Sequence, residues 1–565
     1  MIFYIIYSLP YICIAYYLYC KRSVGAIIKS IIILLVVSSC VNTLVNVPSG
    51  LMRIQSGAIF YALLIWSIVL AYKNRKAVTR SKSKLSKEQK TEAFNFKSKR
   101  KDLTIANPFR GVLIVGGAGS GKSRTFMYPI IKQSAEKGYT GVLYDFKGPE
   151  LMNIAEQCYK HYNSPVKIAK IDFKTPSNSQ RANPLAYVHS AIHATNYSQA
   201  LIFNLMPEYI LKQDFWSRSM LSIFAGTIWY FKKNAPELAT LPHVFAFFFT
   251  TSAKEIVEIL SQDREVKGYI SSLAEAVDQG AEKQVAGVLG TLKNAIGIYN
   301  TPEVFWILSS DDVNLNVNDP QNPTMLLVGN NSALSDSYAP LCSLIITVCS
   351  KLMNEPGKQK SVLIIDESPT VYLPNFEQIP ATARSNKIAV IVGAQDISQM
   401  VDKYGREKTE VLMSNLGNQF YGRTTNIQTA QKVVSMFGQQ EDIVELTNRE
   451  RVGIIGYRNK GKSQSIQKRD RVKVQEMTTL AAGEFAGLMT DGKHNEFVEK
   501  IQLQKMPGGE IEPLNNGYSL NVAEAQFEAI YSEVQTFLDN NPTSGNGTER
   551  SQGKAGYGRV TDMDF

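Results

Sequence analysis

The chain begins with three apolar runs and continues as short apolar segments that alternate with amphipathic stretches. The three runs cover about residues 2–19, 24–47 and 59–72. A helix that crosses a bilayer needs about 17–25 predominantly apolar residues. The pattern therefore predicts a transmembrane anchor of two or three helices within residues 1–72. Because no basic segment precedes the first run, a cleavable signal peptide is the weaker interpretation.

A strongly basic segment follows the last apolar run. Residues 73–101 carry about a dozen Lys and Arg against two acidic residues, Glu88 and Glu92. One interpretation of this charge is control of topology, with attraction to anionic lipid. The other is a basic collar that holds DNA phosphates at the mouth of a pore. In both cases the positive-inside rule predicts a multi-pass membrane protein whose main domain is cytoplasmic.

From about residue 102 onward the pattern is that of an α/β fold. Short apolar runs suited to buried strands alternate with amphipathic segments, as expected for a parallel sheet. Between residues 196 and 309 the pattern is helical and rich in aromatic residues, and this length far exceeds that of a crossover connection. We therefore predict an inserted all-α subdomain there. The predicted strands cover residues 111–115, 141–145, 166–173, 324–328, 361–365 and 388–392.

A glycine-rich stretch follows the first of these strands. Residues 116–123 read GGAGSGKS and match G-x-x-x-x-G-K-[ST] at each required position. Glycines let the backbone pass close to phosphates, and the N-terminus of the next helix favours anions. In this pattern Lys122 binds the β- and γ-phosphates, and the Ser123 hydroxyl is a ligand of Mg²⁺. The motif predicts a site for ATP and Mg²⁺ formed by Gly116, Gly117, Ala118, Gly119, Ser120, Gly121, Lys122, Ser123 and Arg124.

A second motif ends the apolar run 361–365. Asp366 and Glu367 follow this predicted strand, as in a Walker B motif. We expect Asp366 to orient the water ligands of Mg²⁺, and Glu367 to polarise the attacking water as general base. Gln395 follows the predicted strand 388–392 at the same edge of the sheet, where it either contacts the γ-phosphate or caps a loop. Together the motifs predict a hydrolase rather than a protein that only binds nucleotide.

These signals define six predicted regions. Beyond residue 506 the periodicity weakens, and residues 540–562 are rich in Gly, Ser, Thr and Asn, which predicts a weakly structured to disordered tail. The regions are the transmembrane anchor (1–72), a basic juxtamembrane linker (73–101), the first part of a nucleotide-binding domain (102–195), the all-α insertion (196–309), the second part of that domain (310–505) and the C-terminal tail (506–565).

Composition adds one constraint on the partner. The formal net charge of +11 and an isoelectric point near 9.0 indicate a polyanion, either nucleic acid or anionic lipid. The six cysteines and five histidines are scattered, without a C-x-x-C pair or a cluster at metal-ligand spacing. This distribution predicts a reduced compartment and no structural zinc.

Several short stretches carry a resemblance to a known family. Residues 107–111 (NPFRG) lead into the P-loop, residues 145–150 (DFKGPE) are similar to a D-P-K-G-E motif, and residues 183–185 (NPL) match an N-P-L signature. Residues 395–399 (QDISQ), followed by a Tyr-Gly pair and an Asn, are similar to a further motif. Together with the order of the regions, these stretches resemble the type IV secretion coupling proteins of bacterial conjugation (TraG/TraD type) over about residues 1–505. The insertion of Pro149 departs from the family motif, so a role for Glu150 stays open.

The resemblance implies an architecture and a function. It implies a RecA-like P-loop ATPase with an inserted all-α subdomain, anchored in the bacterial inner (plasma) membrane as a homo-hexamer around a channel. Such a protein couples a relaxase–DNA complex, the relaxosome, to the proteins of a type IV secretion channel and drives single-stranded DNA through it. The implied partners are therefore single-stranded DNA, a relaxase, channel proteins and the lipid bilayer.

The resemblance also suggests a residue that acts between subunits. In such rings an arginine from a neighbouring subunit can stabilise the charge on the γ-phosphoryl group. Arg384 matches the position of a family arginine, and Arg423 is a second candidate. The other interpretation of Arg384 is a surface arginine or a DNA contact. With the motifs above, the predicted catalytic residues are Glu367, Lys122, Arg384 and Gln395, and the predicted metal ligands are Ser123 and Asp366.

Other classes of protein stay open at this point. An FtsK-like translocase of duplex DNA has a similar anchor and motor, but usually a winged-helix tail, of which the sequence shows no sign. A docking adaptor that binds ATP without pumping is disfavoured by the intact Lys122, Asp366 and Glu367. A secretion motor for protein substrates is compatible with the sequence. DNA-stimulated ATPase activity would separate the two DNA motors from the other two classes.

Overall fold

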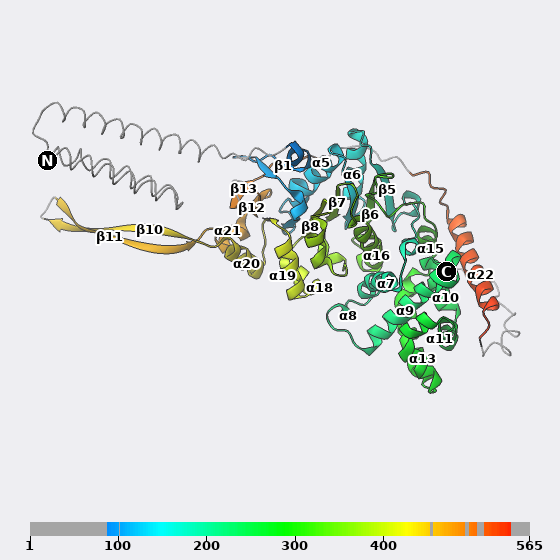
Figure 1. Cartoon of the computed structure of the whole chain (residues 1–565). Coiled ribbons are helices and arrows are strands. Elements are labelled where there is room, and N and C mark those ends of the chain that lie inside the picture. Colours follow the sequence, from blue (N-terminus) through cyan, green and yellow to red (C-terminus); the bar gives the residue numbers. More distant parts are fainter. Residues whose placement is uncertain (1–86, 101, 453–455, 492–495, 506–513, 544–565) are drawn as a thin grey trace, which may run out of the picture. The chain divides into compact units, whose positions relative to one another are not determined.

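The computed structural model describes residues 87–100, 102–452, 456–491, 496–505 and 514–543 (Figure 1). The predicted anchor, residues 1–72, lies outside this part of the chain. None of the helices within the described ranges has the length and apolar character needed to cross a bilayer. This finding corrects the predicted multi-pass inner-membrane location.

A nine-stranded mixed sheet forms the centre of the described chain, in the order β13-β12-β9-β3-β8-β7-β4-β6-β5. The strands from β9 to β5 in this order are mutually parallel, and β12 and β13 continue the sheet with antiparallel pairing. The bounds are β3 Val112–Val115, β4 Thr140–Asp145, β5 Lys167–Asp172, β6 Thr324–Gly329, β7 Ser361–Ile365, β8 Ile388–Ala394, β9 Asn418–Tyr421, β12 Glu484–Leu488 and β13 Glu496–Lys500.

The central strands are apolar along their length because both faces of the sheet are covered. Successive side chains of a strand point to opposite faces, and β3 shows the consequence. Leu113 and Val115 enter one hydrophobic core, whereas Val112 and Ile114 enter the other. The second core also receives α5 (Tyr128–Glu136), α6 (Glu150–His161) and the small β1–β2 hairpin (Phe94–Phe96 and Leu103–Ile105).

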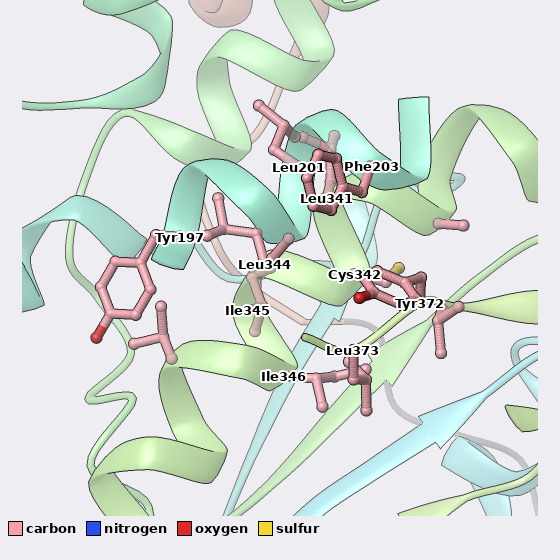
Figure 2. Close-up of a cluster of buried hydrophobic side chains, with 14 of the residues drawn as sticks. Tyr197, Leu201, Phe203, Leu341, Cys342, Leu344, Ile345, Ile346, Tyr372 and Leu373 are labelled. Carbon is pink, nitrogen blue, oxygen red and sulfur yellow. The ribbon is translucent and has the colours of Figure 1, made fainter. Parts of the chain in front are cut away.

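The segment between β5 and β6 is helical, as the sequence predicts. Its core is continuous with one face of the sheet, because buried side chains of these helices and of β3, β7 and β8 belong to a single cluster. Figure 2 shows part of this junction, a cluster in which residues of two helices, α7 and α16 (Ser335–Met353), lie together with Tyr372 and Leu373. The helices are α7 Ala191–Leu205, α8 Glu208–Leu211, α9 Phe215–Asn234, α10 Leu241–Thr250, α11 Ala253–Ser261, α12 Arg264–Tyr269, α13 Ser271–Asp278, α14 Glu282–Ile296 and α15 Pro302–Leu308.

The predicted weakly structured tail contains a long helix, α22 (Leu520–Asn540), which corrects that prediction. The Ser519 side chain accepts a hydrogen bond from the backbone N–H of Val522 and thereby caps the helix. Ile530, Val534 and Leu538 recur at intervals of four residues and are buried. This apolar stripe packs against α10 and α15 and stabilises the helix.

Further elements of the described chain lie outside the central sheet. A second hairpin, which the sequence analysis did not predict, is formed by β10 (Gln439–Val452) and β11 (Gly456–Asp470), paired antiparallel as a separate two-stranded sheet. The remaining helices are α4 Lys87–Glu92, α17 Ile379–Ala383, α18 Ile397–Tyr404, α19 Arg406–Asn415, α20 Ile427–Phe437 and α21 Val474–Thr479.

Candidate nucleotide-binding site

The glycine-rich loop joins the carboxyl end of β3 to a turn of π-helix, Ser123–Met127, which continues into α5. Gly119 and Gly121 have φ angles of +76° and +88°, a region that L side chains rarely adopt. A Cβ on Gly116 would lie 2.5 Å from Ser120 Oγ. These three positions therefore require glycine. The loop curls back at the carboxyl edge of the sheet, where ligands of open α/β sheets bind.

Lys122, Glu367 and Gln395 meet at this edge, as the sequence predicts, because β3, β8 and β7 are neighbours in the sheet. Lys122 Nζ donates hydrogen bonds to Glu367 Oε2 at 2.9 Å and to the backbone oxygen of Asp366 at 3.4 Å. The backbone N–H of Gln395 donates to the other carboxylate oxygen, Glu367 Oε1, at 2.8 Å. Both oxygens of Glu367 are thus held, and Gln395 acts on Glu367 through its backbone.

Asp366 is buried beside this pair. Its Oδ1 atom has no hydrogen-bond partner among the described residues, and the same holds for Ser120 Oγ in the loop. Burial raises the pKa of the Asp366 carboxyl to about 6, while the nearby Lys122 ammonium opposes the shift. Buried polar atoms without partners are rare and call for an explanation. A buried carboxylate oxygen without a partner, on a residue next to Lys122, fits the hydrated Mg²⁺ that accompanies a nucleoside triphosphate.

The loop after β4 brings further charged groups to Asp366. Asp145 accepts hydrogen bonds from the backbone N–H groups of residues 147, 151 and 152, and burial raises its pKa to about 7. Glu150 accepts a hydrogen bond of 2.5 Å from the Tyr128 hydroxyl of α5, and its charge contributes to the raised pKa of Asp366. The structure therefore places Glu150, whose role the sequence left open, beside the Walker motifs.

Residues next to β9, β12 and β13 form hydrogen bonds with the phosphate-binding loop and with Arg124, which follows it. No sequence motif predicts these contacts. The backbone oxygen of Arg423, just beyond β9, accepts from the N–H of Gly117 at 2.9 Å, and its guanidinium donates to the Ala118 oxygen at 3.4 Å. The N–H of Gly483 donates to the Ser120 oxygen at 2.9 Å. Arg124 is exposed and its Nε donates to the Gln504 oxygen at 3.3 Å. These partners lie far along the chain, and no local motif marks them.

Arg384 does not reach the site within its own chain. It is exposed and follows α17, before β8 begins at Ile388. The amino end of β8 lies at the edge of the sheet opposite to Gln395. A direct role of Arg384 in this chain's own site is therefore excluded by its position, and an action on the site of another copy stays a prediction.

The largely parallel sheet, the phosphate-binding loop after β3 and the Asp-Glu pair after β7, which β8 separates from β3 in the sheet, define a P-loop NTPase of the RecA-like class. The chain belongs to the family described as type IV secretory system conjugative DNA transfer, whose model matches residues 71–485. It is a type IV coupling protein, with a role in coupling DNA to the secretion system. No curated protein matches the chain.

Solved structures of a conjugative coupling protein share the fold. The unbound monoclinic form of TrwBdeltaN70 has a TM-score of 0.54 at 15% identity, covering 75% of this chain and 92% of that chain. TrwB in complex with the non-hydrolysable GTP analogue GDPNP has a TM-score of 0.52 at 16% identity, covering 75% and 93%. TrwB in complex with ADP and Mg²⁺ has a TM-score of 0.51 at 15% identity, covering 71% and 87%. At these identities the likeness establishes the fold.

Proposed function

We propose that this coupling protein hydrolyses ATP in a Mg²⁺-dependent reaction and uses it to move single-stranded DNA from a relaxase complex into a type IV secretion channel. The observation that carries the proposal is the convergence of Lys122, Glu367 and Gln395 from three adjacent strands. The Lys122 ammonium, which in this proposal binds phosphate, lies 2.9 Å from the Glu367 carboxylate, which in this proposal is the general base. The solved TrwB complexes with ADP and Mg²⁺ and with GDPNP support nucleotide binding in this fold.

The side chains at the site have distinct tasks in this reaction. Lys122 binds the terminal phosphates, and the loop N–H groups orient them. Ser123 and Asp366 would hold Mg²⁺, which supplies positive charge to the phosphoryl oxygens when bound. Glu367 accepts a proton from the attacking water, and the Gln395 N–H fixes the direction of its carboxylate. Glu150 and Asp145 add negative charge around Asp366.

The proposal includes assembly into a ring of six copies. A translocating ring needs a residue of one subunit at the site of the next. Arg384 suits this task because it is exposed and lies at the edge of the sheet remote from its own Lys122. The predicted region boundaries, with the helices between β5 and β6 as a subdomain, belong to the same proposal.

The test is ATP hydrolysis by the purified full-length protein, alone, with single-stranded DNA and with duplex DNA of equal length. Glu367→Gln is the control for contaminating ATPases. We expect hydrolysis that single-stranded DNA stimulates more than duplex DNA does, and that the substitution removes. Hydrolysis indifferent to both DNAs would contradict the DNA-pumping part of the proposal and favour a motor for protein substrates.

A further inference from the structure

The chain that follows Glu367 links the nucleotide site to the helices between β5 and β6. Residues 368–373, here called the linking segment, begin with a short 3-10 turn and continue to Tyr372 and Leu373, which are buried. The Tyr372 ring lies 6.2 Å from the Phe203 ring of α7, centroid to centroid. Figure 2 shows Tyr372 and Leu373 in one cluster with residues of α7 and α16. The segment is therefore packed against helices that lie outside the sheet.

The side chain of Asn204, in the last turn of α7, forms hydrogen bonds with the backbone of this segment. Its Nδ2 donates to the Tyr372 oxygen at 2.7 Å, and its Oδ1 accepts from the Tyr372 N–H at 2.7 Å. The second amide hydrogen goes to the Ala200 oxygen at 2.7 Å. Ser343 of α16 donates to the same Tyr372 oxygen at 2.5 Å. Asn204 is 6% exposed, so these bonds are made away from water, where a lost partner is costly.

A second set of hydrogen bonds continues from the segment to Glu367. Thr370 Oγ1 donates to the Glu367 backbone oxygen at 2.6 Å. Because this uses the single hydroxyl hydrogen of Thr370, the Tyr144 hydroxyl must be the donor in the 2.9 Å contact between the two. Tyr144 in turn accepts from Asn330 Nδ2 at 2.8 Å. The backbone of Glu367 is thus bonded to Thr370, and through Thr370 to Tyr144 of β4 and Asn330 just after β6. Tyr372, five residues after Glu367, is held by Asn204 of α7.

We propose that Asn204 is a positioning residue through which the helical region sets the placement of the Glu367 carboxylate. This inference rests on the proposed function and deepens it. A shift of α7 relative to the sheet moves Tyr372 directly, and the short segment passes the shift to Glu367. Among the described residues, the side chains of Asn204 and Ser343 form no hydrogen bond with the phosphate-binding loop. Asn204 therefore controls the rate of hydrolysis and its response to DNA, and leaves nucleotide affinity unchanged.

The test compares the full-length wild type with Asn204→Ala and with Asn318→Ala as matched control. Asn318 is as deeply buried and its Nδ2 donates to the Met353 oxygen at 2.9 Å, but it precedes β6, at the other edge of the sheet. For each protein kcat, KM for ATP, nucleotide Kd and the stimulation by single-stranded DNA are measured, together with thermal stability. Both substitutions remove one buried amide, so both are expected to lower stability.

Of these two variants, Asn204→Ala but not Asn318→Ala is expected to lower kcat, by about tenfold or more, and to reduce DNA stimulation toward one, with a nucleotide Kd within about twofold of wild type. Ser343→Ala, which removes a single hydroxyl, should show the same pattern more weakly and serves if Asn204→Ala does not fold. Equal kcat and equal stimulation in the Asn204, Ser343 and Asn318 variants would overturn the inference. A wild type without DNA-stimulated hydrolysis would instead contradict the proposed function.

Discussion

The Lys122 ammonium and the Glu367 carboxylate form an ion pair of 2.9 Å, with 10% and 7% of their side chains exposed. Lys122 is expected to bind phosphate and Glu367 to activate water. While they are paired with each other, neither group is free for its task. A triphosphate would compete with Glu367 for Lys122, because both are anions that are attracted to the same ammonium. Binding of the phosphates would thus release Glu367 Oε2, while the Gln395 N–H keeps hold of Oε1. The pair couples occupation of the loop to availability of the base.

Replacing Glu367 by Gln should separate binding from hydrolysis. We expect kcat to fall by about 100-fold or more, the usual contribution of a general base. Nucleotide affinity should be unchanged or higher, because the neutral amide competes less for Lys122. In the free protein the buried Lys122 charge is left without its counterion, so added nucleotide should raise the melting temperature more than in wild type. Turnover measurements and thermal shifts check both points.

Lys122→Ala is the control for this prediction. It removes the cation itself, so nucleotide binding and the thermal shift should both be lost. A Glu367→Gln protein that still turns over within about threefold of wild type would show that another group is the base.

A methyl group at Gly116 should disrupt the phosphate-binding loop. The added Cβ would meet Ser120 Oγ at 2.5 Å and Ser120 Cβ at 3.1 Å, so the Ser120 side chain must turn away and the loop must give at Ser120 Cβ. We expect nucleotide Kd to rise by about tenfold or more, equivalent to about 1.4 kcal/mol. Gly268→Ala in α12 is the matched control, since a Cβ there meets no atom within 4 Å. Titration with a fluorescent nucleotide measures the Kd of both variants. Equal affinities of Gly116→Ala and Gly268→Ala would show that nucleotide binding does not depend on the close contact between Gly116 and Ser120.

The raised pKa of Asp145 should make folding pH-dependent. An exposed Asp titrates near 3.9, whereas burial raises the pKa of Asp145 to about 7 in the folded protein. Between about pH 4 and 7 the folded state therefore binds more protons than the unfolded state, and the free energy of unfolding falls as pH rises through this window. Asp145→Asn should remove this contribution, so its stability should depend less on pH.

Urea unfolding of the nucleotide-free protein at pH 5 and pH 8 measures the effect. At each pH the free energy of unfolding of Asp145→Asn is subtracted from that of wild type. This difference should change by a few kcal/mol at most between pH 5 and pH 8, because a pKa shift of one unit corresponds to about 1.4 kcal/mol. Asp278→Asn, at an exposed position of α13, controls for loss of a surface charge. If the Asp145 and Asp278 variants show the same pH dependence as wild type, Asp145 is ionised in both states.

The residues of the two motifs were predictable because their chemistry requires fixed residue types at fixed spacing. Lys122 and Glu367 lie 245 positions apart, yet each follows an apolar strand, and parallel strands end at one edge. The place of Glu150 was not predictable, because it depends on β4 lying beside β7, and strand order is not encoded in a local pattern. The contact of Arg423 with the loop depends in the same way on β9 pairing with β3.

The errors have separate causes. The prediction of a weakly structured tail is wrong for α22 because the weakening periodicity beyond residue 506 hides a short helical repeat, in which Ile530, Val534 and Leu538 recur every four residues. The β10–β11 hairpin lacks the apolar alternation that marks a half-buried strand. Arg384 is not among these errors. The resemblance implies that it acts on a neighbouring copy, and a residue with that role need not approach its own site, so the role stays a prediction.

Arg384 can be tested by mixing two inactive proteins. The Lys122→Ala protein lacks a working phosphate-binding loop but keeps Arg384. The Arg384→Ala protein keeps the loop but lacks the arginine. If Arg384 acts on a neighbour, an Arg384→Ala subunit next to a Lys122→Ala subunit has a complete site, and random 1:1 rings should recover about one quarter of wild-type sites. Each protein alone should be slower by about 1,000-fold or more, the range of arginine fingers.

The control mixture combines Lys122→Ala with Glu367→Gln. Both defects lie in the same site of one chain, because Lys122 and Glu367 are paired within it. No arrangement of subunits then gives a complete site, so mixing should restore nothing. Recovery of hydrolysis in the first mixture alone would establish both a shared site and an oligomer. If the first mixture stays inactive under conditions where size measurements show mixed assemblies, Arg384 does not act between subunits.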